Sequence, residues 1–351
     1  MKKLMKGNDA VCEAAIRAGC KAFFGYPITP QNEIPEYMSI HMEPAGGCFI
    51  QAESEIAAIN MVYGAACTGN RVMTSSSSPG MALKQEGISY LVGADLPCVI
   101  VSVARCGPGL GGILPSQADY FQTVKGGGNG DYFTPVYAPS TIQEAADLTQ
   151  KAFDIAEKYR TPVLVLFDGA LGQMMEPVEI VDAVPQPFDT KWVTDGNADK
   201  RGRNIVTSLN LTGPGLEGEN IERFERYAKI KQEETMVQST VADGDELAIV
   251  AYGMAARVAQ SAVDMLKAQG VKAGLVRPIT LWPFPDETLQ ALPKSVKNVL
   301  TVEMSMGQMV DDVKIAVNGR VPVHFFGRTG GVVMTPEEIV EAALKIGKGG
   351  A

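Results

Sequence analysis

The stretch Gly25-Tyr26-Pro27-Ile28-Thr29-Pro30 decides how the first half of this chain folds. It follows a short apolar run, Ala22-Phe23-Phe24, which predicts a buried strand. Proline fixes φ at about −65° and disfavours the helical conformation at the residue before it, so the strand is expected to end in a stiff turn. Parallel sheets bind ligands beyond the carboxyl ends of their strands. The turn is therefore expected to hold the hydroxyl of Thr29 at a ligand site.

Strand and helix patterns alternate on both sides of this turn. Short apolar segments separated by helical ones are typical of βαβ units, in which helices cover both faces of a parallel sheet. Asn8 is expected to cap a first helix. The expected strands are residues 21–25, 48–52, 71–74, 97–103 and 162–167, and the expected helices are residues 54–67, 81–92 and 141–160.

The alternation breaks between residues 184 and 241, where a polar stretch precedes a charged, helical one at 217–234. It then resumes, with strands expected at 246–251, 271–276, 299–303 and 321–326 and helices at 255–269, 309–317 and 336–346. We therefore expect an α/β protein of two parallel-sheet domains, residues 1–183 and 242–351, joined by a linker or arm at 184–241. A chain of 351 residues has the length of two domains.

Composition excludes several classes of function. With 31 basic and 40 acidic residues the net charge is −9, which argues against a nucleic-acid or anionic-membrane surface. No run approaches the roughly 20 apolar residues that span a bilayer, and the first residues lack the apolar core of a signal peptide, so a cytoplasmic protein is expected. Six cysteines without a C-x-x-C pair, and two histidines, predict no metal site on this chain.

Four polar groups follow four expected strands. Thr29 follows the first, Glu55 the second, the hydroxyl-rich loop 74–80 with Ser77 the third, and Arg105 the fourth. In a parallel sheet these strand ends share one edge. A hydroxyl, a carboxylate, an anion-binding loop and a guanidinium are therefore expected to converge there.

Each group alone also has a structural interpretation. Thr29 before Pro30 could be a helix N-cap followed by proline at the first helical position. Glu55 after a Ser54 cap could simply favour the helix dipole, and the loop 74–80 could be an ordinary polar connection. Arg105 has fewer structural reasons for its position. Its planar guanidinium group suits a carboxylate or a phosphate. Convergence of all four favours a functional site.

The glycines at 107, 109 and 112 fit the spacing G-x-G-x-x-G, with Asp131 further on. In dinucleotide-binding proteins this motif opens a helix whose N-terminus holds the pyrophosphate. Residues 113–117 (Ile-Leu-Pro-Ser-Gln) do not predict the start of a helix. A dinucleotide site is therefore not expected here.

On these motifs the chain resembles the 2-oxoacid:ferredoxin oxidoreductases. It is similar to their separate alpha subunit, which carries the pyrimidine-binding domain for thiamine diphosphate. The segments that carry the resemblance are 25–30, 54–55, 74–80 with 85–87, and 105–109 in the first domain. In the second domain, 277–285 and 303–308 resemble the family's transketolase-C-terminal-like domain.

The resemblance implies a role for each matching residue. Glu55 matches the catalytic carboxylate on the aminopyrimidine ring, and Arg105 matches the arginine that binds the substrate carboxylate. Thr29 matches a hydroxyl near the substrate and the cofactor, while Tyr26, Pro27 and Ser77 match cofactor contacts. The implied reaction decarboxylates a 2-oxoacid, with the thiazolium ring holding electrons, then acylates coenzyme A and reduces ferredoxin.

Parts of that reaction have no counterpart in the chain. The Gly-Asp-Gly motif for magnesium and diphosphate is absent, as are the cysteines of iron–sulfur clusters. The resemblance therefore implies a hetero-oligomer, in which a beta subunit carries the diphosphate and Mg²⁺ site. Gamma and ferredoxin-like subunits would complete it, with the clusters on these partners.

The loops after Arg105 bear on the substrate. Residues 107–112 and 115–120, followed by 126–132, are most similar to the 2-oxoisovalerate (3-methyl-2-oxobutanoate) type. Cys106 stands where a glycine is common in the family. Specificity for 2-oxoglutarate or pyruvate remains an alternative, as does a non-catalytic scaffolding subunit, which would keep the fold without the chemistry.

Overall fold

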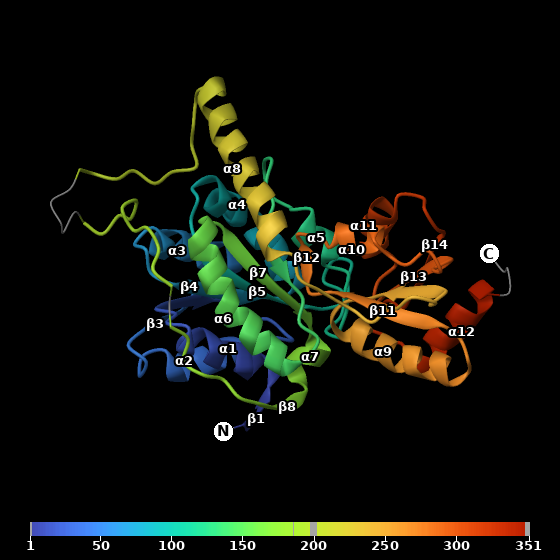
Figure 1. The fold of residues 1–351 in the computed structure, drawn as a ribbon. Coiled ribbons are helices and arrows are strands. Elements are labelled where there is room, and N and C mark those ends of the chain that lie inside the picture. Colours follow the sequence, from blue (N-terminus) through green and yellow to red (C-terminus); the bar gives the residue numbers. More distant parts are fainter. Residues whose placement is uncertain (1, 185, 197–201, 348–351) are drawn as a thin grey trace.

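A computed structural model describes residues 2–184, 186–196 and 202–347 and contains two large sheets flanked by helices and a small two-stranded one (Figure 1). The first sheet has seven strands in the order β12-β6-β7-β5-β4-β2-β3. Its neighbouring strands are parallel except for the antiparallel pair β12–β6. The strands are β2 (Ala22–Gly25), β3 (Cys48–Gln51), β4 (Val72–Ser76), β5 (Cys98–Ala104), β6 (Val136–Tyr137), β7 (Pro162–Asp168) and β12 (Thr280–Trp282).

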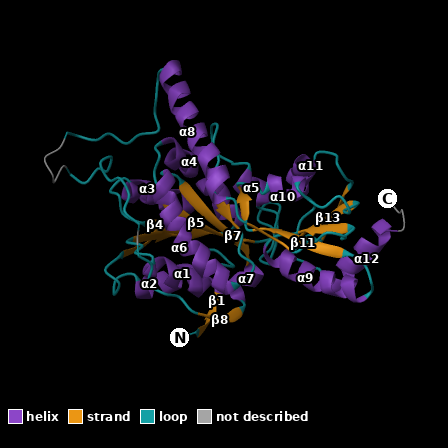
Figure 2. Cartoon of the chain, in the orientation of Figure 1, coloured by secondary structure: helices purple, strands orange, loops and turns teal. Residues whose placement is uncertain are grey.

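Helices cover both faces of the first sheet (Figure 2). The strand order and right-handed crossovers place α2 and α6 on one face, where α1 packs against both, and α3 and α4 together on the other. The helices of this part are α1 (Gly7–Arg17), α2 (Glu33–His41), α3 (Glu55–Ala66), α4 (Ser78–Gly93), α5 (Tyr120–Val124), α6 (Ile142–Tyr159) and α7 (Gly169–Gln173). A small antiparallel sheet joins β1 (Lys3–Lys6) to β8 (Met175–Val178).

The second sheet has five strands in the order β14-β13-β10-β11-β9, parallel except at β9. Its strands are β9 (Val237–Ser239), β10 (Leu247–Val250), β11 (Ala273–Pro278), β13 (Asn298–Glu303) and β14 (Val323–Gly327). Its helices are α9 (Gly253–Ala268), α10 (Asp286–Gln290), α11 (Met309–Val317) and α12 (Pro336–Gly347). Helix α8 (Gly213–Glu234) projects from the molecule beside α4 (Figure 1).

The expected α/β class with mostly parallel sheets is confirmed. The structure adds strands that the sequence patterns did not predict, and two of them cross the expected boundaries. Strand β9, from the segment expected as a linker, lies at the edge of the second sheet, whereas β12, from the second half, closes the first sheet. The division into 1–183, 184–241 and 242–351 stays a prediction. Within the described ranges, no helix is long and apolar enough to cross a membrane.

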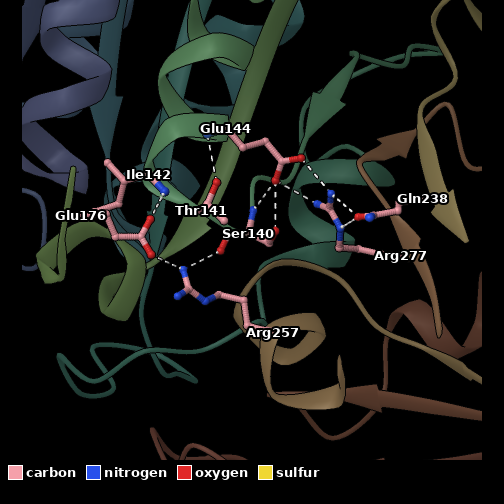
Figure 3. Close-up of polar contacts among 8 residues, drawn as sticks. All are labelled: Ser140, Thr141, Ile142, Glu144, Glu176, Gln238, Arg257 and Arg277. Carbon is pink, nitrogen blue, oxygen red and sulfur yellow. Dashed lines mark hydrogen bonds and ion pairs between the residues drawn. The ribbon is translucent and has the colours of Figure 1, made fainter. Parts of the chain in front are cut away.

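Paired charges join the two halves of the chain (Figure 3). The Arg277 guanidinium donates to both carboxylate oxygens of Glu144, each at 2.9 Å. Arg257 on α9 donates to the Glu176 carboxylate at 2.6 Å and to the Ser140 carbonyl at 3.1 Å. Bidentate arginine–carboxylate pairs fix orientation as well as distance. The start of α6 is thereby held against the second sheet.

The expected cap at Asn8 is wrong. Helix α1 begins at Gly7, and the Asn8 side chain makes no cap hydrogen bond. Its amide instead donates to the Pro30 carbonyl at 2.9 Å and to Glu33 at 3.0 Å. A contact with the turn that follows β2 has replaced the local cap.

Arg71 forms a buried ion-pair network at the start of β4. Its guanidinium donates to both oxygens of Glu157, at 2.9 and 2.6 Å, and to the Asp154 carboxylate. A further bond of 2.7 Å reaches the carbonyl of Ala18, after α1. The side chains of Arg71 and Glu157 are each 6% exposed. The network ties the sheet to α6 and α1 at one point.

We expect Arg71→Met to lower the free energy of unfolding by about 3–5 kcal/mol, because it leaves the Glu157 carboxylate buried without its counter-charge. Urea denaturation of the full chain measures the loss. The double variant Arg71→Met/Glu157→Met is the matched control and should lose less, since neither charge is then left unpaired. An equal or larger loss in the double variant would contradict this account.

Candidate active site

The carboxyl ends of β2, β4 and β5 meet at one edge of the first sheet, since these strands are parallel neighbours. Contacts link the residues that follow them. Arg105 bonds to the main chain of Thr29, and Ser78, next to Ser77, bonds to the main chain of Arg105. Two residues beyond Ser78, Gly80 lies against the side chain of Glu55. The structure thus brings the four expected groups to one edge.

The turn after β2 is held by four side-chain hydrogen bonds, three of them from distant parts of the chain. Its Thr29–Pro30 peptide bond is cis. Its main-chain oxygens accept four side-chain hydrogen bonds: Tyr26 from Gln31 at 3.1 Å, Thr29 from Arg105 at 2.9 Å, and Pro30 from Asn8 at 2.9 Å and Gln173 at 3.0 Å. The turn is therefore a rigid part of the edge.

The helix-cap interpretation of Thr29 is wrong. Helix α2 begins at Glu33, and the residue before it is Asn32. The Thr29 hydroxyl accepts a 3.3 Å bond from the Asn32 amide. Thr29 and Tyr26 are half-buried and Pro27 is exposed, so all three present surface at the edge.

Glu55 is the first residue of α3 and is 6% exposed. The expected cap before it is confirmed, because the Ser54 hydroxyl accepts a 3.2 Å bond from the main-chain N–H of Ala57. A side chain at Gly80 would collide with the Glu55 carboxylate, since an added Cβ would lie 2.5 Å from Oε1. Among the described residues, none donates a hydrogen bond to that carboxylate. The carboxyl group of Glu55 is thus nearly buried and accepts no hydrogen bond from the described residues.

Other polar atoms at this edge are also unsatisfied. The hydroxyls of Ser76, Ser77 and Ser102 and the Nε of Arg105 are buried without a partner. Buried polar groups are nearly always hydrogen-bonded in folded proteins. Four such atoms on neighbouring strand ends, beside the unused carboxyl of Glu55, indicate a place built for a polar ligand.

Arg105 connects the turn to the loop that follows β5. Its Nη1 donates to the Thr29 carbonyl, and its Nη2 donates to the Leu110 carbonyl at 3.0 Å. The guanidinium is therefore fixed in place while its Nε stays unpaired. The loop does not continue into a helix before α5 at Tyr120, so the G-x-G-x-x-G spacing does not form a dinucleotide motif.

Asp119 supports Arg105 through Ser78. The Ser78 hydroxyl donates to the Asp119 carboxylate at 2.6 Å and accepts from the Arg105 main chain at 2.9 Å. Burial raises the pKa of Asp119 to about 6, while the bond from Ser78 and the charge of Arg105 act to lower it. Sequence reasoning missed Asp119 because no strand end precedes it.

Lys84 was also missed. It is a fully buried residue of α4 whose Nζ lies 3.3 Å from the main-chain oxygen of Glu55. Helical spacing carried a signal, because Lys84 shares a face with the buried residues Met81 and Ile88. A lysine inside an apolar stripe predicts either a hidden partner or an exposed helix face, and the structure shows the partner.

Known proteins are similar to this chain over nearly its whole length, and three of them illustrate the likeness. The ketoisovalerate oxidoreductase subunit VorB of Methanothermobacter marburgensis is 49% identical over 98% of this chain and 97% of its own length. The 2-oxoglutarate synthase subunit KorA of Methanothermobacter thermautotrophicus is 35% identical over 98% of both chains. The solved 2-oxoglutarate:ferredoxin oxidoreductase of Magnetococcus marinus superposes with a TM-score of 0.86 at 27% identity, over 98% of this chain and 65% of that longer one.

Two family models match successive parts of the sequence. The thiamine diphosphate-binding model of the pyruvate flavodoxin/ferredoxin oxidoreductases matches residues 13–243, which include Thr29, Glu55, Ser77 and Arg105. The model of pyruvate:ferredoxin oxidoreductase core domain II matches residues 245–339. The family expected from the sequence motifs is confirmed: this chain belongs to the 2-oxoacid:ferredoxin oxidoreductases.

Proposed function

We propose that this chain is the thiamine-binding alpha subunit of a branched-chain 2-oxoacid:ferredoxin oxidoreductase. Its reaction would convert 3-methyl-2-oxobutanoate and coenzyme A into the acyl-CoA and carbon dioxide, with electrons passing to ferredoxin. The observation that carries the proposal is the unused, nearly buried carboxyl of Glu55 beside unsatisfied hydroxyls at a strand edge. A carboxyl group and neighbouring hydroxyls are the hydrogen-bonding partners that an aminopyrimidine ring requires.

Thiamine diphosphate fits these residues. Glu55 would hold its ring nitrogen, with Ser77, Tyr26 and Pro27 lining the ring. When bound, the cofactor supplies a thiazolium ring that holds the electrons released as carbon dioxide leaves. The side chains of this chain would bind and orient the cofactor and the substrate.

Glu55 would pair with the ring nitrogen through its carboxyl group, whose oxygens receive no hydrogen bond from the described residues. Arg105 would bind the substrate carboxylate, because its guanidinium is fixed by two carbonyls and keeps an unpaired Nε–H. The Thr29 hydroxyl, beside the main-chain oxygen that Arg105 holds, would contact the 2-oxo oxygen.

The loop beyond Arg105 supports an apolar substrate side chain. Residues 106–118 contain no charged side chain, and Leu110, Ile113 and Leu114 are exposed apolar residues within it. A second carboxylate, as in 2-oxoglutarate, would be expected to need a cation there. The 49% identity to a ketoisovalerate oxidoreductase subunit, against 35% to a 2-oxoglutarate synthase subunit, supports the same assignment.

Helices α3 and α4 support the need for a partner subunit. Helix α3 (EIAAINMVYGAA) has one charged residue, Glu55, and no polar face. A helix that is apolar all round is normally buried, yet Ile56 and Met61 on α3, with Leu83 and Tyr90 on α4, are exposed. We assign this face to a beta subunit that carries the diphosphate and Mg²⁺ site. Gamma and ferredoxin-like subunits would hold the iron–sulfur clusters and pass electrons to ferredoxin.

Replacing Glu55 tests the catalytic assignment. In the enzyme assembled with its beta subunit, we expect Glu55→Gln and Glu55→Ala to lower kcat by about a hundredfold or more, as loss of an acid–base group does, with little change in KM. The assay is 2-oxoacid-dependent reduction of viologen with coenzyme A. Glu53→Gln, an exposed acid two residues away, is the matched control. A Glu55→Ala enzyme of unchanged rate would instead favour a scaffolding subunit.

Arg105→Lys should raise the KM for the 2-oxoacid by roughly ten- to a hundredfold, which corresponds to one hydrogen bond between charged groups. Lysine keeps the charge but cannot hold two carbonyls and a carboxylate together. Initial rates across 2-oxoacid concentrations give KM, and the KM for coenzyme A in the same variant serves as the control. Equal increases in both constants would indicate a general distortion rather than lost substrate binding.

The substrate assignment predicts an order of rates. We expect kcat/KM for 3-methyl-2-oxobutanoate to exceed that for 2-oxoglutarate, because the loop 106–118 offers no cation for the second carboxylate. Pyruvate should also react less well, since it buries less apolar surface. Measurement of all three acids with one enzyme preparation decides this, and a preference for 2-oxoglutarate would refute the branched-chain assignment while leaving the family unchanged.

A further inference from the structure

Lys84 contacts the main chain of Glu55 and has no part in the function proposed so far. Its side chain extends from α4 into the interior and is 0% exposed. The ammonium donates to the carbonyl of Glu55 at 3.3 Å and to the hydroxyl of Thr74 on β4 at 3.2 Å. One buried side chain therefore joins α4, the first residue of α3 and the central part of the sheet.

Thr74 extends this connection to the turn. Its hydroxyl donates to the carbonyl of Phe24 at 2.6 Å, in the strand that leads into residues 25–30. The chain of contacts from Lys84 thus reaches two walls of the proposed site. Glu55 is held through its main chain, and the turn is held through Thr74 and β2.

A lysine is a costly way to fill this position. Burial disfavours an ammonium and lowers the pKa of Lys84 to about 8, with the charge of Glu55 opposing the shift. The N-terminal end of a helix, here that of α3, also disfavours a cation. An apolar side chain such as methionine would pack beside Met81 and Ile88 without these penalties. Packing alone does not explain the residue.

We propose that Lys84 is a positioning residue that fixes the start of α3, and with it the Glu55 carboxyl, relative to β4 and the turn. The proposal rests on the catalytic role proposed for Glu55. It differs from that role because Lys84 would act through the main chain and would touch neither substrate nor cofactor. Correct placement of an acid–base group within a fraction of an ångström governs turnover more than substrate binding.

The first test is kinetic. In the assembled enzyme, Lys84→Met should lower kcat by about ten- to a hundredfold and leave the KM for the 2-oxoacid nearly unchanged. Thr74→Val, which removes one acceptor without changing the charge, should lower kcat several-fold. Lys158→Met is the matched control, because Lys158 is an exposed lysine of α6 paired with Glu233 and Glu234. That control should keep the wild-type kcat.

The second test does not depend on activity. Hydrogen exchange of the isolated full chain should become faster in Lys84→Met at the first amides of α3 and at residues 25–31, and not in Lys158→Met. A lysine that only fills space would leave this exchange unchanged when a methionine replaced it.

The pH dependence of stability tests the buried ammonium itself. The charged group that acts on Lys84 is Glu55 of α3, while β4 presents a hydroxyl and β2, through it, a carbonyl. The unfolded chain holds this proton up to its ordinary pKa of 10.5, whereas the folded chain releases it near 8. The unfolded state therefore binds more protons between these values, so wild-type stability should rise with pH there relative to Lys84→Met. Parallel stability curves would contradict the lowering of the pKa of Lys84 by burial.

The outcomes separate this inference from the proposed function. If Glu55→Gln is impaired but Lys84→Met has wild-type kcat and exchange, the positioning role is wrong and the role of Glu55 stands. If Glu55→Gln is fully active, the proposed function fails and the role of Lys84 fails with it. Should Lys84→Met not fold, Thr74→Val decides, and unchanged kcat and exchange in that variant would overturn the proposal.

Discussion

Four side chains, three of them from distant parts of the sequence, hold the main-chain oxygens of the turn after β2, and the proposed site depends on this constraint. Pro27 and Pro30 have no N–H, so the turn cannot build a regular hydrogen-bond ladder of its own. Its carbonyls are satisfied instead by Gln31, by Arg105 after β5, by Asn8 of α1 and by Gln173 of α7. An unsatisfied buried carbonyl costs about 1–3 kcal/mol. Three of these contacts come from segments far from the turn in the sequence, so the turn is positioned largely by the tertiary fold.

The same edge of the sheet combines this order with unsatisfied groups. Gln31 accepts a bond from Ser75 at 2.6 Å, and Thr74 bonds to Phe24, so these hydroxyls of β4 serve the turn. The next two hydroxyls, Ser76 and Ser77, have no partner within the described chain. Along four consecutive residues the hydroxyls thus change from internal support to buried groups without a partner. That change lies at the edge where the ligand site is proposed.

The sequence predicted the parts of the fold that depend on local pattern. Strands β5 and β7 are continuous apolar runs between helices, which is how buried parallel strands appear in any sequence. Strands β6, β9 and β12 are two or three residues long and exist through pairing with distant segments, so no periodicity reveals them. Asn8 has the propensity of a cap, but its bond to Pro30 outweighed that propensity. Glu55 and Arg105 could be placed at the sheet edge because each follows a strand. The apolar helix face around Lys84 carried a signal for its burial, but not for its partners, a main-chain carbonyl and a hydroxyl that only the folded chain brings together.

The role proposed for Arg105 would couple substrate binding to the order of the loop that follows β5. Its two Nη atoms are bonded to the turn and to Leu110, so the guanidinium sets the distance between both segments. A carboxylate bound at the remaining N–H groups would lie between a half-buried hydroxyl, Thr29, and a loop of apolar side chains. In the proposed site, the residue that binds the carboxylate common to all 2-oxoacids would thereby also place the loop that contacts their variable side chain. Changes in the loop can then alter specificity while the carboxylate site stays intact.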